Sequence, residues 1–195
     1  MKIIVVGASG TVGGAVSAAL EAAGHEVVRA SRRGPVQVDL EDTSSIEALF
    51  RAVPEGDAVV CCAASGPLVD LASASDEEFA DGLRGKLSGQ VALARHALHR
   101  LRDNGSITLT GGTFAAPLAG GSLGALVNAG LAGFVRNAAA ELPRGLRINV
   151  VSPGWVSETL AALGISDAVG TPAAEVARWY VGCVCGTSSG QTITA

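Results

Sequence analysis

The amino-terminal segment constrains the fold of this chain more than any other. A continuous apolar run, Ile3–Val6, ends at Gly7, and an alanine-rich segment, Thr11–Ala23, then runs as far as Gly24. An unbroken apolar run is typical of a strand that is buried on both faces, and a glycine after an alanine-rich segment commonly ends a helix. The chain therefore begins with a predicted strand, a glycine turn and a predicted helix.

The same alternation continues along the chain. The sequence predicts further strands at residues 26–30, 36–38, 57–62, 106–110, 147–151 and 191–194. It predicts helices at 44–53, 77–101, 122–142, 158–163 and 173–184, with 77–101 as one helix or as two that meet near Gly82 and Gly85. Strands that alternate with helices indicate a parallel sheet, and right-handed crossovers make it doubly wound. The predicted fold class is therefore α/β, a doubly wound parallel sheet (Rossmann fold) of about seven strands with helices on both faces.

Length and composition favour a single domain. The chain has 195 residues, of which 48% are hydrophobic and 16% are charged. This length suits one full core and is short for two. Because no linker, charge block or internal repeat interrupts the pattern, we expect one domain over residues 1–195.

Charge and cysteine usage exclude several classes of function. The net charge is −4 and no basic cluster is present, so we expect no nucleic-acid partner. No apolar run approaches the ~18 residues of a membrane span, and the amino terminus lacks a secretory signal, so we expect a cytoplasmic protein without a membrane partner. Cys61, Cys62, Cys183 and Cys185 have neither zinc-site nor redox-motif spacing, so we expect no metal site.

The glycine turn predicts a dinucleotide site. Gly7, Gly10 and Gly13 stand three residues apart, after a strand and at the start of a helix. The first glycine allows a tight turn, the second lets the backbone approach a pyrophosphate, and the third lets the helix pack close to the sheet. The helix amino terminus then offers free N–H groups and a positive dipole end to the phosphates. The predicted contacts of this turn are Gly7, Ser9, Gly10, Thr11, Val12 and Gly13.

The end of the second predicted strand favours one dinucleotide over the other. A NAD-binding protein usually has an acidic residue there for the ribose 2′-hydroxyl. This chain instead has Ser31, Arg32 and Arg33. Guanidinium groups suit a 2′-phosphate, so NADP(H) is favoured over NAD(H). The alternative is that both arginines are solvated loop residues.

Several later segments, together with the glycine turn, resemble the short-chain dehydrogenase/reductase family. They are VDL (38–40), DAVVCCAAS (57–65), GSITLTGG (105–112) and INVVSPGWVSET (148–159). The resemblance implies that Asp39 and Leu40 flank the adenine. It also implies that Cys62, Ala63 and Ala64 lie beside the cofactor ribose. It places Pro153, Gly154 and Val156 along the nicotinamide, with Thr159 near its amide or phosphate.

The departure from the family is in its proton donor. The family supplies the proton from the tyrosine of a Y-x-x-x-K motif on the helix that corresponds to residues 122–142. Alignment puts Gly124 at the tyrosine and Asn128 at the lysine. The chain has one tyrosine, Tyr180, with Val184 four residues later, so no such motif occurs. The resemblance places Tyr180 on the last helix, far from the reaction centre.

Four residues are candidates to supply part of the missing chemistry. Lys86 falls at the family's relay asparagine and is one of only two lysines; otherwise it is a lysine that reaches solvent. Asn128 can hold the nicotinamide ribose, or it packs between helices. Thr110 and Thr113 can orient a carbonyl group, or they are structural residues of a strand and a loop.

These observations leave three hypotheses open. The first is an NADP(H)-dependent oxidoreductase with an altered proton route and an unidentified small-molecule substrate. The second is a non-catalytic NADP(H)-binding sensor or scaffold of the same fold. The third is a structural subunit that pairs with an active relative. Because 122–142 is nearly uncharged, we also expect a homodimer or homotetramer formed through helices 77–101 and 122–142.

Overall fold

The computed structural model describes residues 1–64, 66, 68–165 and 169–194. A seven-stranded sheet forms its centre, with the order β3-β2-β1-β4-β5-β6-β7 and every described pairing parallel. The strands are β1 (Lys2–Val6), β2 (Glu26–Ser31), β3 (Val36–Gln37), β4 (Ala58–Cys61), β5 (Ser106–Thr110), β6 (Arg147–Ser152) and β7 (Thr192–Thr194). The predicted doubly wound parallel sheet is confirmed.

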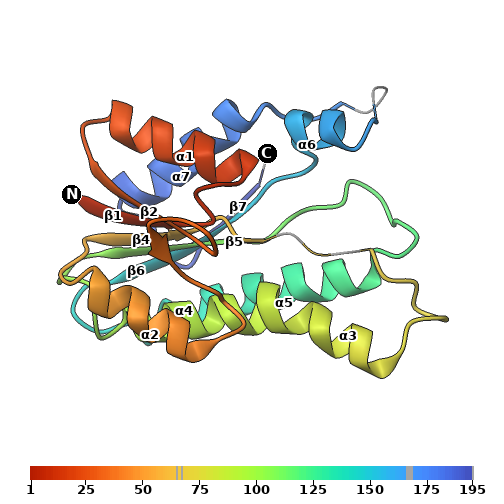
Figure 1. Ribbon diagram of the computed structural model, residues 1–195, viewed down its shortest axis with the longest axis horizontal. Helices are drawn as coiled ribbons and strands as arrows, with labels where there is room; N and C mark the ends of the chain where they lie inside the picture. Colours follow the sequence, from red (N-terminus) through yellow and green to blue (C-terminus); the bar gives the residue numbers. More distant parts are fainter. Residues whose placement is uncertain (65, 67, 166–168, 195) are drawn as a thin grey trace.

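Helices cover both faces of this sheet, as Figure 1 shows. They are α1 (Thr11–Ala22), α2 (Thr43–Ala52), α3 (Asp76–Leu83), the π-helix η1 (Arg84–Gly89), α4 (Gln90–Ala97), α5 (Ser122–Ala138), α6 (Ser157–Ala162) and α7 (Ala173–Cys185). Helices α1 and α7 pack on one face, and α2, α4 and α5 pack on the other. Two apolar cores result, one on each side of the strands.

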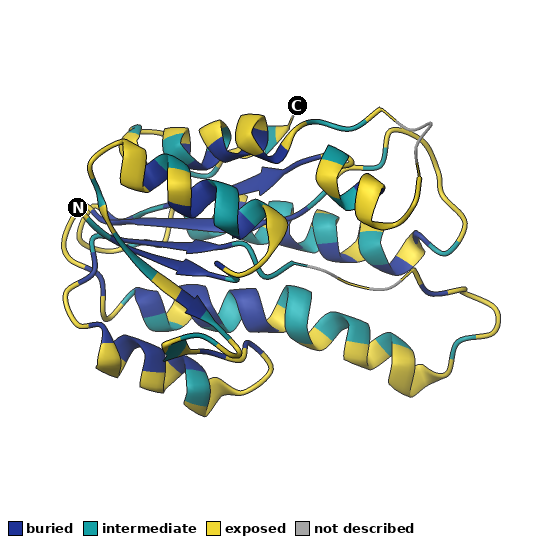
Figure 2. Ribbon diagram, turned by 45° about the horizontal axis from the view of Figure 1, so that its top comes forward, coloured by how far each residue is buried: buried dark blue, intermediate teal, exposed yellow. Residues whose placement is uncertain are grey.

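Alternate strand residues enter the two cores, as a strand with both faces buried requires. In β1, Ile4 and Val6 face α2, α4 and α5, whereas Ile3 and Val5 face α1 and α7. Figure 2 shows the resulting pattern, with buried strands between helices whose outer faces are exposed. The unbroken apolar run at the amino terminus is explained by this two-sided burial.

The strand order reverses beside β1. The chain runs outward from β1 to β2 and β3, then returns to place β4 on the other side of β1. In an open parallel sheet, ligands bind outside the carboxyl ends of the strands at such a reversal. The segment that follows β1 here is the glycine turn.

Three regions illustrate how the elements differ from the sequence prediction. The region 77–101 contains α3, η1 and α4 rather than one α-helix or two. Its glycines pack tightly: a Cβ on Gly89 would lie 2.6 Å from the Leu40 carbonyl oxygen. Helix α5 ends at Ala138 rather than at residue 142, and Pro143 follows, which disfavours helical backbone before it. Strand β3 has only two residues and lies at the sheet edge.

Among the helices that the structure describes, none is long and apolar enough to cross a bilayer. Across the same described ranges, no group of three or more His, Cys, Asp or Glu side chains is arranged to hold a metal ion.

Candidate functional site

The glycine turn has the geometry that a close approach to a ligand requires. Gly7 has a φ of +81°, and a Cβ there would lie 2.7 Å from the Ala63 nitrogen. A Cβ on Gly13 would lie 2.1 Å from the Gly7 carbonyl oxygen, whereas one on Gly10 would lie 3.4 Å from it. Gly7 and Gly13 therefore admit no side chain without rearrangement, because the atoms in the way are backbone.

The helix that follows this turn begins without a side-chain cap. Gly10 is the N-cap residue of α1, and no side chain bonds to the first turn, which carries no acidic residue. Ser9, Gly10 and Thr11 are exposed, and Val12 is half-buried. The first N–H groups of a helix lack partners within the helix and carry its positive dipole end. This turn therefore offers an anion site built from backbone groups.

Two exposed arginines lie beside the glycine turn. Gly7 N and Ala8 N both donate to the carbonyl oxygen of Ala30, which directly precedes Ser31 at the end of β2. Arg32 and Arg33 follow and are exposed. Among the described residues, neither guanidinium group forms an ion pair. Both cations are thus available to an anionic ligand at this edge.

The residues expected near the adenine come next in the chain. Asp39 is exposed, and its carboxylate accepts a hydrogen bond from Glu41 N at 3.0 Å. Leu40 is buried, and its backbone packs against Gly89 of η1. This segment therefore packs closely against the helix that carries Lys86.

The segment after β4 forms the other wall of the glycine turn. Cys62 N donates to the Val6 carbonyl at 2.7 Å, and Cys62, Ala63 and Ala64 are half-buried. Burial raises the pKa of the Cys62 thiol well above its ordinary value. The thiol is therefore neutral at physiological pH, and this wall is apolar.

Asn128 lies where the family lysine aligns, and it faces the end of β5. A Cβ on Gly112 would lie 3.2 Å from Asn128 Nδ2. The Oδ1 atom of Asn128 is buried and has no hydrogen-bond partner within the described structure. Gly124, at the tyrosine position, is covered by the ring of Phe114, whose Cζ would lie 3.1 Å from a Cβ there. An unused amide oxygen and an aromatic ring thus occupy the place of the usual pair.

Lys86 lies in the π-helix η1, four residues before Gln90. Residues four apart share a helix face, and the Gln90 side chain reaches both the Lys86 carbonyl oxygen and the backbone of Thr110. Gln90 thereby links the backbone of Lys86 to the carboxyl end of β5. It is half-buried, and burial lowers its pKa from the usual value of 10.5. No carboxylate of the described chain pairs with it.

Gln90 was not identified from the sequence. It is fully buried. Its side-chain amide donates to Thr110 O and accepts from Thr110 N, each at 2.8 Å, which are the bonds that a neighbouring strand would otherwise make. It thereby holds the end of β5, where pairing with β4 has stopped at Thr108. The sequence signal that could have identified Gln90 is a glutamine in an otherwise apolar stretch of predicted helix.

The hydroxyl groups of Thr110 and Thr113 both donate to backbone carbonyl groups. Thr110 Oγ1 donates to the Cys61 carbonyl and is 2.7 Å from the Tyr180 hydroxyl. Because the single hydroxyl hydrogen of Thr110 is used, Tyr180 must be the donor in that pair. Thr113 Oγ1 donates to the Ser152 carbonyl at 3.2 Å. Both hydroxyls are engaged in structural bonds, which argues against the prediction that they orient a carbonyl group.

The position of Tyr180 also needs correction. It was expected to lie far from the reaction centre, but its hydroxyl reaches Thr110 at the end of β5 from the α7 face. Its side chain is fully buried, and burial raises its pKa well above the ordinary value. Tyr180 therefore lies close to the candidate site, but its side chain is buried in the core and is not exposed to a ligand there.

The segment after β6 completes this edge of the sheet. Pro153 and Val156 are buried, Thr159 is half-buried, and Gly154 and Trp155 are exposed. The Pro153 carbonyl accepts a hydrogen bond from Thr113 N at 2.9 Å, which joins the loops after β5 and β6. The residues predicted along the nicotinamide therefore lie beside the loop that carries Phe114.

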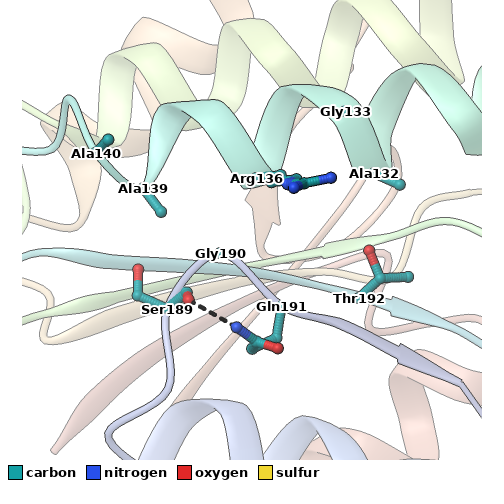
Figure 3. A pocket seen from close by; sticks show the side chains of 9 residues that line it. All are labelled: Ala132, Gly133, Arg136, Ala139, Ala140, Ser189, Gly190, Gln191 and Thr192. Atoms are coloured by element: carbon teal, nitrogen blue, oxygen red, sulfur yellow. Dashed lines mark hydrogen bonds between the residues drawn. The ribbon is translucent and has the colours of Figure 1, made fainter.

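A cavity elsewhere in the molecule does not belong to this edge. It has a volume of about 750 Å³ and lies between the carboxyl-terminal half of α5 and the segment that leads into β7, as Figure 3 shows. Its lining residues are Ala132, Gly133, Arg136, Ala139, Ala140, Ser189, Gly190, Gln191 and Thr192. None of the predicted site residues is among them.

Comparisons with known proteins support this description. The family model for enoyl-(acyl carrier protein) reductase matches residues 6–185. The protein lin1944 from Listeria innocua is 36% identical, with a TM-score of 0.95, and the match covers 100% of this chain and 99% of that one. Curated proteins gave no significant match.

Two more distant solved structures share the fold. A small-chain dehydrogenase in complex with NADPH is 22% identical, with a TM-score of 0.87 over 100% of this chain and 96% of that one. A short-chain dehydrogenase from Burkholderia cenocepacia J2315 in complex with NADP is 22% identical, with a TM-score of 0.82 over 98% of this chain and 94% of that one. Given the family model, the strand order and the glycine turn, the chain belongs to the short-chain dehydrogenase/reductase family of oxidoreductases.

Proposed function

We propose that the chain is an NADP(H)-dependent oxidoreductase that delivers its proton by a route other than the family tyrosine. The observation that carries the proposal is the glycine turn, because Gly7 and Gly13 leave no room for a side chain and α1 begins uncapped. A structural subunit has no need of such a turn. Two neighbours solved with NADPH or NADP support the choice of cofactor.

The residues of this edge fit each part of the dinucleotide. The first turn of α1 would hold the pyrophosphate, and Arg32 and Arg33 would hold a 2′-phosphate. The segment Cys62–Ala64 would lie along the ribose, and Pro153 with Val156 along the nicotinamide. When bound, the cofactor supplies a hydride to a carbonyl carbon or takes one from it.

The chain must then supply a proton at the carbonyl oxygen. Lys86 carries a partly desolvated ammonium group, and Gln90 links its backbone to the end of β5. The unpartnered Oδ1 of Asn128 is suited to accept a hydrogen bond from a water molecule or a ribose hydroxyl. We propose Lys86 as the proton donor and Asn128 as the residue that positions its partner.

The second candidate is a protein that binds NADP(H) without turnover. The contact between Phe114 and Gly124 favours it, because an aromatic ring covers the position from which the family tyrosine acts. The two candidates share the cofactor site and differ only in chemistry at the end of β5.

Stopped-flow oxidation of NADPH with a panel of aldehydes, ketones and quinones distinguishes them. The oxidoreductase gives slow turnover, which falls about 10²-fold in Lys86→Met if Lys86 donates the proton. A non-catalytic protein binds NADPH with a measurable dissociation constant and turns over none of the panel. Failure to bind NADPH at all would refute both candidates.

The cellular location of the protein and the kind of partner it has are also proposals. Its four cysteines form no disulfide, and two of them are buried, which fits a reducing compartment. We propose a cytoplasmic location and a small-molecule substrate, without a nucleic-acid or membrane partner.

A further inference from the structure

Gln90 places a buried amide at the point where the central sheet divides. Strand β4 stays paired with β1 as far as Cys61, and β5 stays paired with β6 as far as Thr110. The described pairing between β4 and β5 themselves ends two residues earlier in β5, at Thr108. The carboxyl ends of two central strands therefore part, and the backbone groups that face the gap need other partners.

Gln90 supplies those partners to β5 and uses its whole amide to do so. Its Oε1 atom accepts from Thr110 N, and its Nε2 atom donates to the carbonyl oxygens of Thr110 and Lys86, each contact at 2.8 Å. A primary amide has two hydrogens to donate, so both are used. Thr110 Oγ1 in turn donates to the Cys61 carbonyl of β4. One chain of side-chain hydrogen bonds therefore runs from η1 through Thr110 to the end of β4.

The winding of η1 makes the bond to Lys86 possible. In a regular α-helix, the N–H group of residue 90 bonds to the carbonyl oxygen of residue 86. Here the Gln90 N–H group bonds to the Leu87 carbonyl instead, and the Gln90 side chain takes the Lys86 carbonyl. Single-turn π-helices occur frequently at functional sites. The irregular turn therefore gives the Gln90 amide a fixed anchor on the helix that carries Lys86.

The two strand ends that this chain of bonds joins lead into different walls of the candidate site. Beyond β4, Ala63 lies so near the glycine turn that a Cβ on Gly7 would be 2.7 Å from the Ala63 nitrogen. Beyond β5, Gly112 lies against Asn128, because a Cβ on Gly112 would be 3.2 Å from Asn128 Nδ2. Gln90 is fully buried, so it can act on a ligand only through these walls.

We propose that Gln90 is a positioning residue of the cofactor site: its amide holds the parted ends of β4 and β5 at the spacing that a bound dinucleotide requires. The inference rests on the proposed function, since it assumes that NADP(H) binds along the walls that follow these strands. Without the amide, the backbone N–H and C=O groups of Thr110 and the Lys86 carbonyl lose a buried partner, which is unfavourable. The strand ends then shift toward other partners, and the two walls lose their spacing.

Asn149 provides a matched control for the loss of a buried amide. It is fully buried in β6, accepts from Gln191 N at 3.1 Å and donates to the Ser188 carbonyl at 2.8 Å. Its amide therefore bonds to both backbone N–H and backbone C=O groups, as that of Gln90 does. The segment that it holds leads into β7 and helps to line the cavity of Figure 3, where none of the predicted site residues lies.

The test compares Gln90→Met with Asn149→Leu, each close in volume to the residue it replaces. Thermal melting should show that both variants are less stable than the wild type, because each leaves buried backbone groups unpaired. In a fluorescence titration, Gln90→Met should weaken NADPH binding about tenfold, which is within the range for a residue that does not touch the ligand. Asn149→Leu should leave the NADPH affinity unchanged. Equal losses of affinity in the two variants would overturn the proposal, since they would reflect stability alone.

A measurement on the unmodified protein tests the same point without a substitution. The side-chain amide hydrogens of Gln90 and Asn149 exchange with solvent when the bonds around them open, and NMR follows both. If a bound cofactor depends on the spacing of the strand ends, NADPH at about 100 times its dissociation constant should slow exchange at Gln90 by about 100-fold. Exchange at Asn149 should slow much less. Equal slowing at both amides would contradict a local role for Gln90.

The NADPH affinity of the wild type separates failure of this inference from failure of the proposed function. If the wild type binds NADPH and Gln90→Met binds it equally well, Gln90 has no positioning role, and the proposed function is unaffected. If the wild type does not bind NADPH, the proposed function fails, and the role of Gln90 in it fails as well.

Discussion

The two ends of the candidate site differ in how much of the family pattern they keep. At the glycine turn, Gly7 and Gly13 pack against backbone so closely that no other residue fits, and α1 begins without a cap. At the end of β5, Gly124 and Asn128 stand at the positions of the family tyrosine and lysine, and Phe114 covers Gly124. The proposed cofactor site and the proposed proton route are therefore separable, because only the first is built from backbone geometry.

This contrast has a physical basis. A pyrophosphate site made from N–H groups and a helix dipole requires a backbone path, which a few glycines determine. A proton donor requires one side chain of suitable pKa within reach of the substrate oxygen, and several residue types can provide it. The following experiments test whether the two ends of the site are as independent as they look.

The largest effect is expected from rebuilding the family pair. Gly124→Tyr with Asn128→Lys restores a phenol and a lysine, and Phe114→Ala removes the ring that would collide with the new tyrosine. A positioned general acid contributes about 10²- to 10⁴-fold. We expect a gain of that order in NADPH-dependent carbonyl reduction, measured by stopped flow. The control variant carries Gly124→Phe with the same Asn128→Lys and Phe114→Ala substitutions. It should show no gain in carbonyl reduction.

Removal of Lys86 should have the next largest effect. If its ammonium group donates the proton, Lys86→Met should lower the residual rate by about 10²-fold, the low end for a general acid. In the wild type the rate should fall as pH rises through the pKa of Lys86, which burial places below 10.5. A rate that is unchanged in Lys86→Met would assign the proton to water instead.

Lys86 also affects stability, with a definite sign. Its lowered pKa means that the folded state binds fewer protons than the unfolded state between the two values. Burial of the charge therefore costs stability below the folded pKa, and this cost disappears as pH rises toward 10.5. Lys86→Met should raise the melting temperature at neutral pH, by about 2–4 °C for each kcal/mol recovered. The difference should shrink at high pH.

A smaller change in affinity is expected from Gly13→Ala. The new Cβ would meet the Gly7 carbonyl at 2.1 Å, so the turn must open. Overpacking of this kind costs about 1–3 kcal/mol, which weakens NADPH binding by about 5- to 150-fold in a fluorescence titration. Gly14→Ala is the matched control, because its Cβ would lie 3.8 Å from the nearest atom. Equal losses in both variants would mean that the turn does not hold the cofactor.

Removal of the two arginines should change the preference for NADPH over NADH rather than abolish dinucleotide binding. Arg32→Ala/Arg33→Ala should weaken NADPH about tenfold, or about 1.4 kcal/mol, and leave NADH unchanged. The modest size reflects the exposure of both side chains, where solvent screens charge. If wild-type protein binds NADPH and NADH equally, the argument for a 2′-phosphate site fails.

The smallest expected effect is on the oligomeric state. Ala125, Ala129 and Gly133 line the exposed face of α5, and small residues there allow close helix contact. We propose a homodimer or homotetramer through the regions 77–101 and 122–142. Sedimentation should show it at micromolar concentration, and Ala129→Arg should shift it toward the monomer without loss of NADPH affinity. A wild-type monomer would contradict the proposal.

The sequence by itself determined the parallel sheet, the glycine turn and the absence of the tyrosine–lysine pair. Each of these depends on local pattern: apolar runs such as Ile3–Val6, glycines at set spacing, or a motif that is present or not. What only the tertiary structure decided were contacts between distant segments. Tyr180 reaches Thr110 across 70 positions, Gln90 replaces a strand partner of β5, and Phe114 covers Gly124. No local pattern encodes these contacts, because the packing of the sheet against its two helical layers brings the partners together.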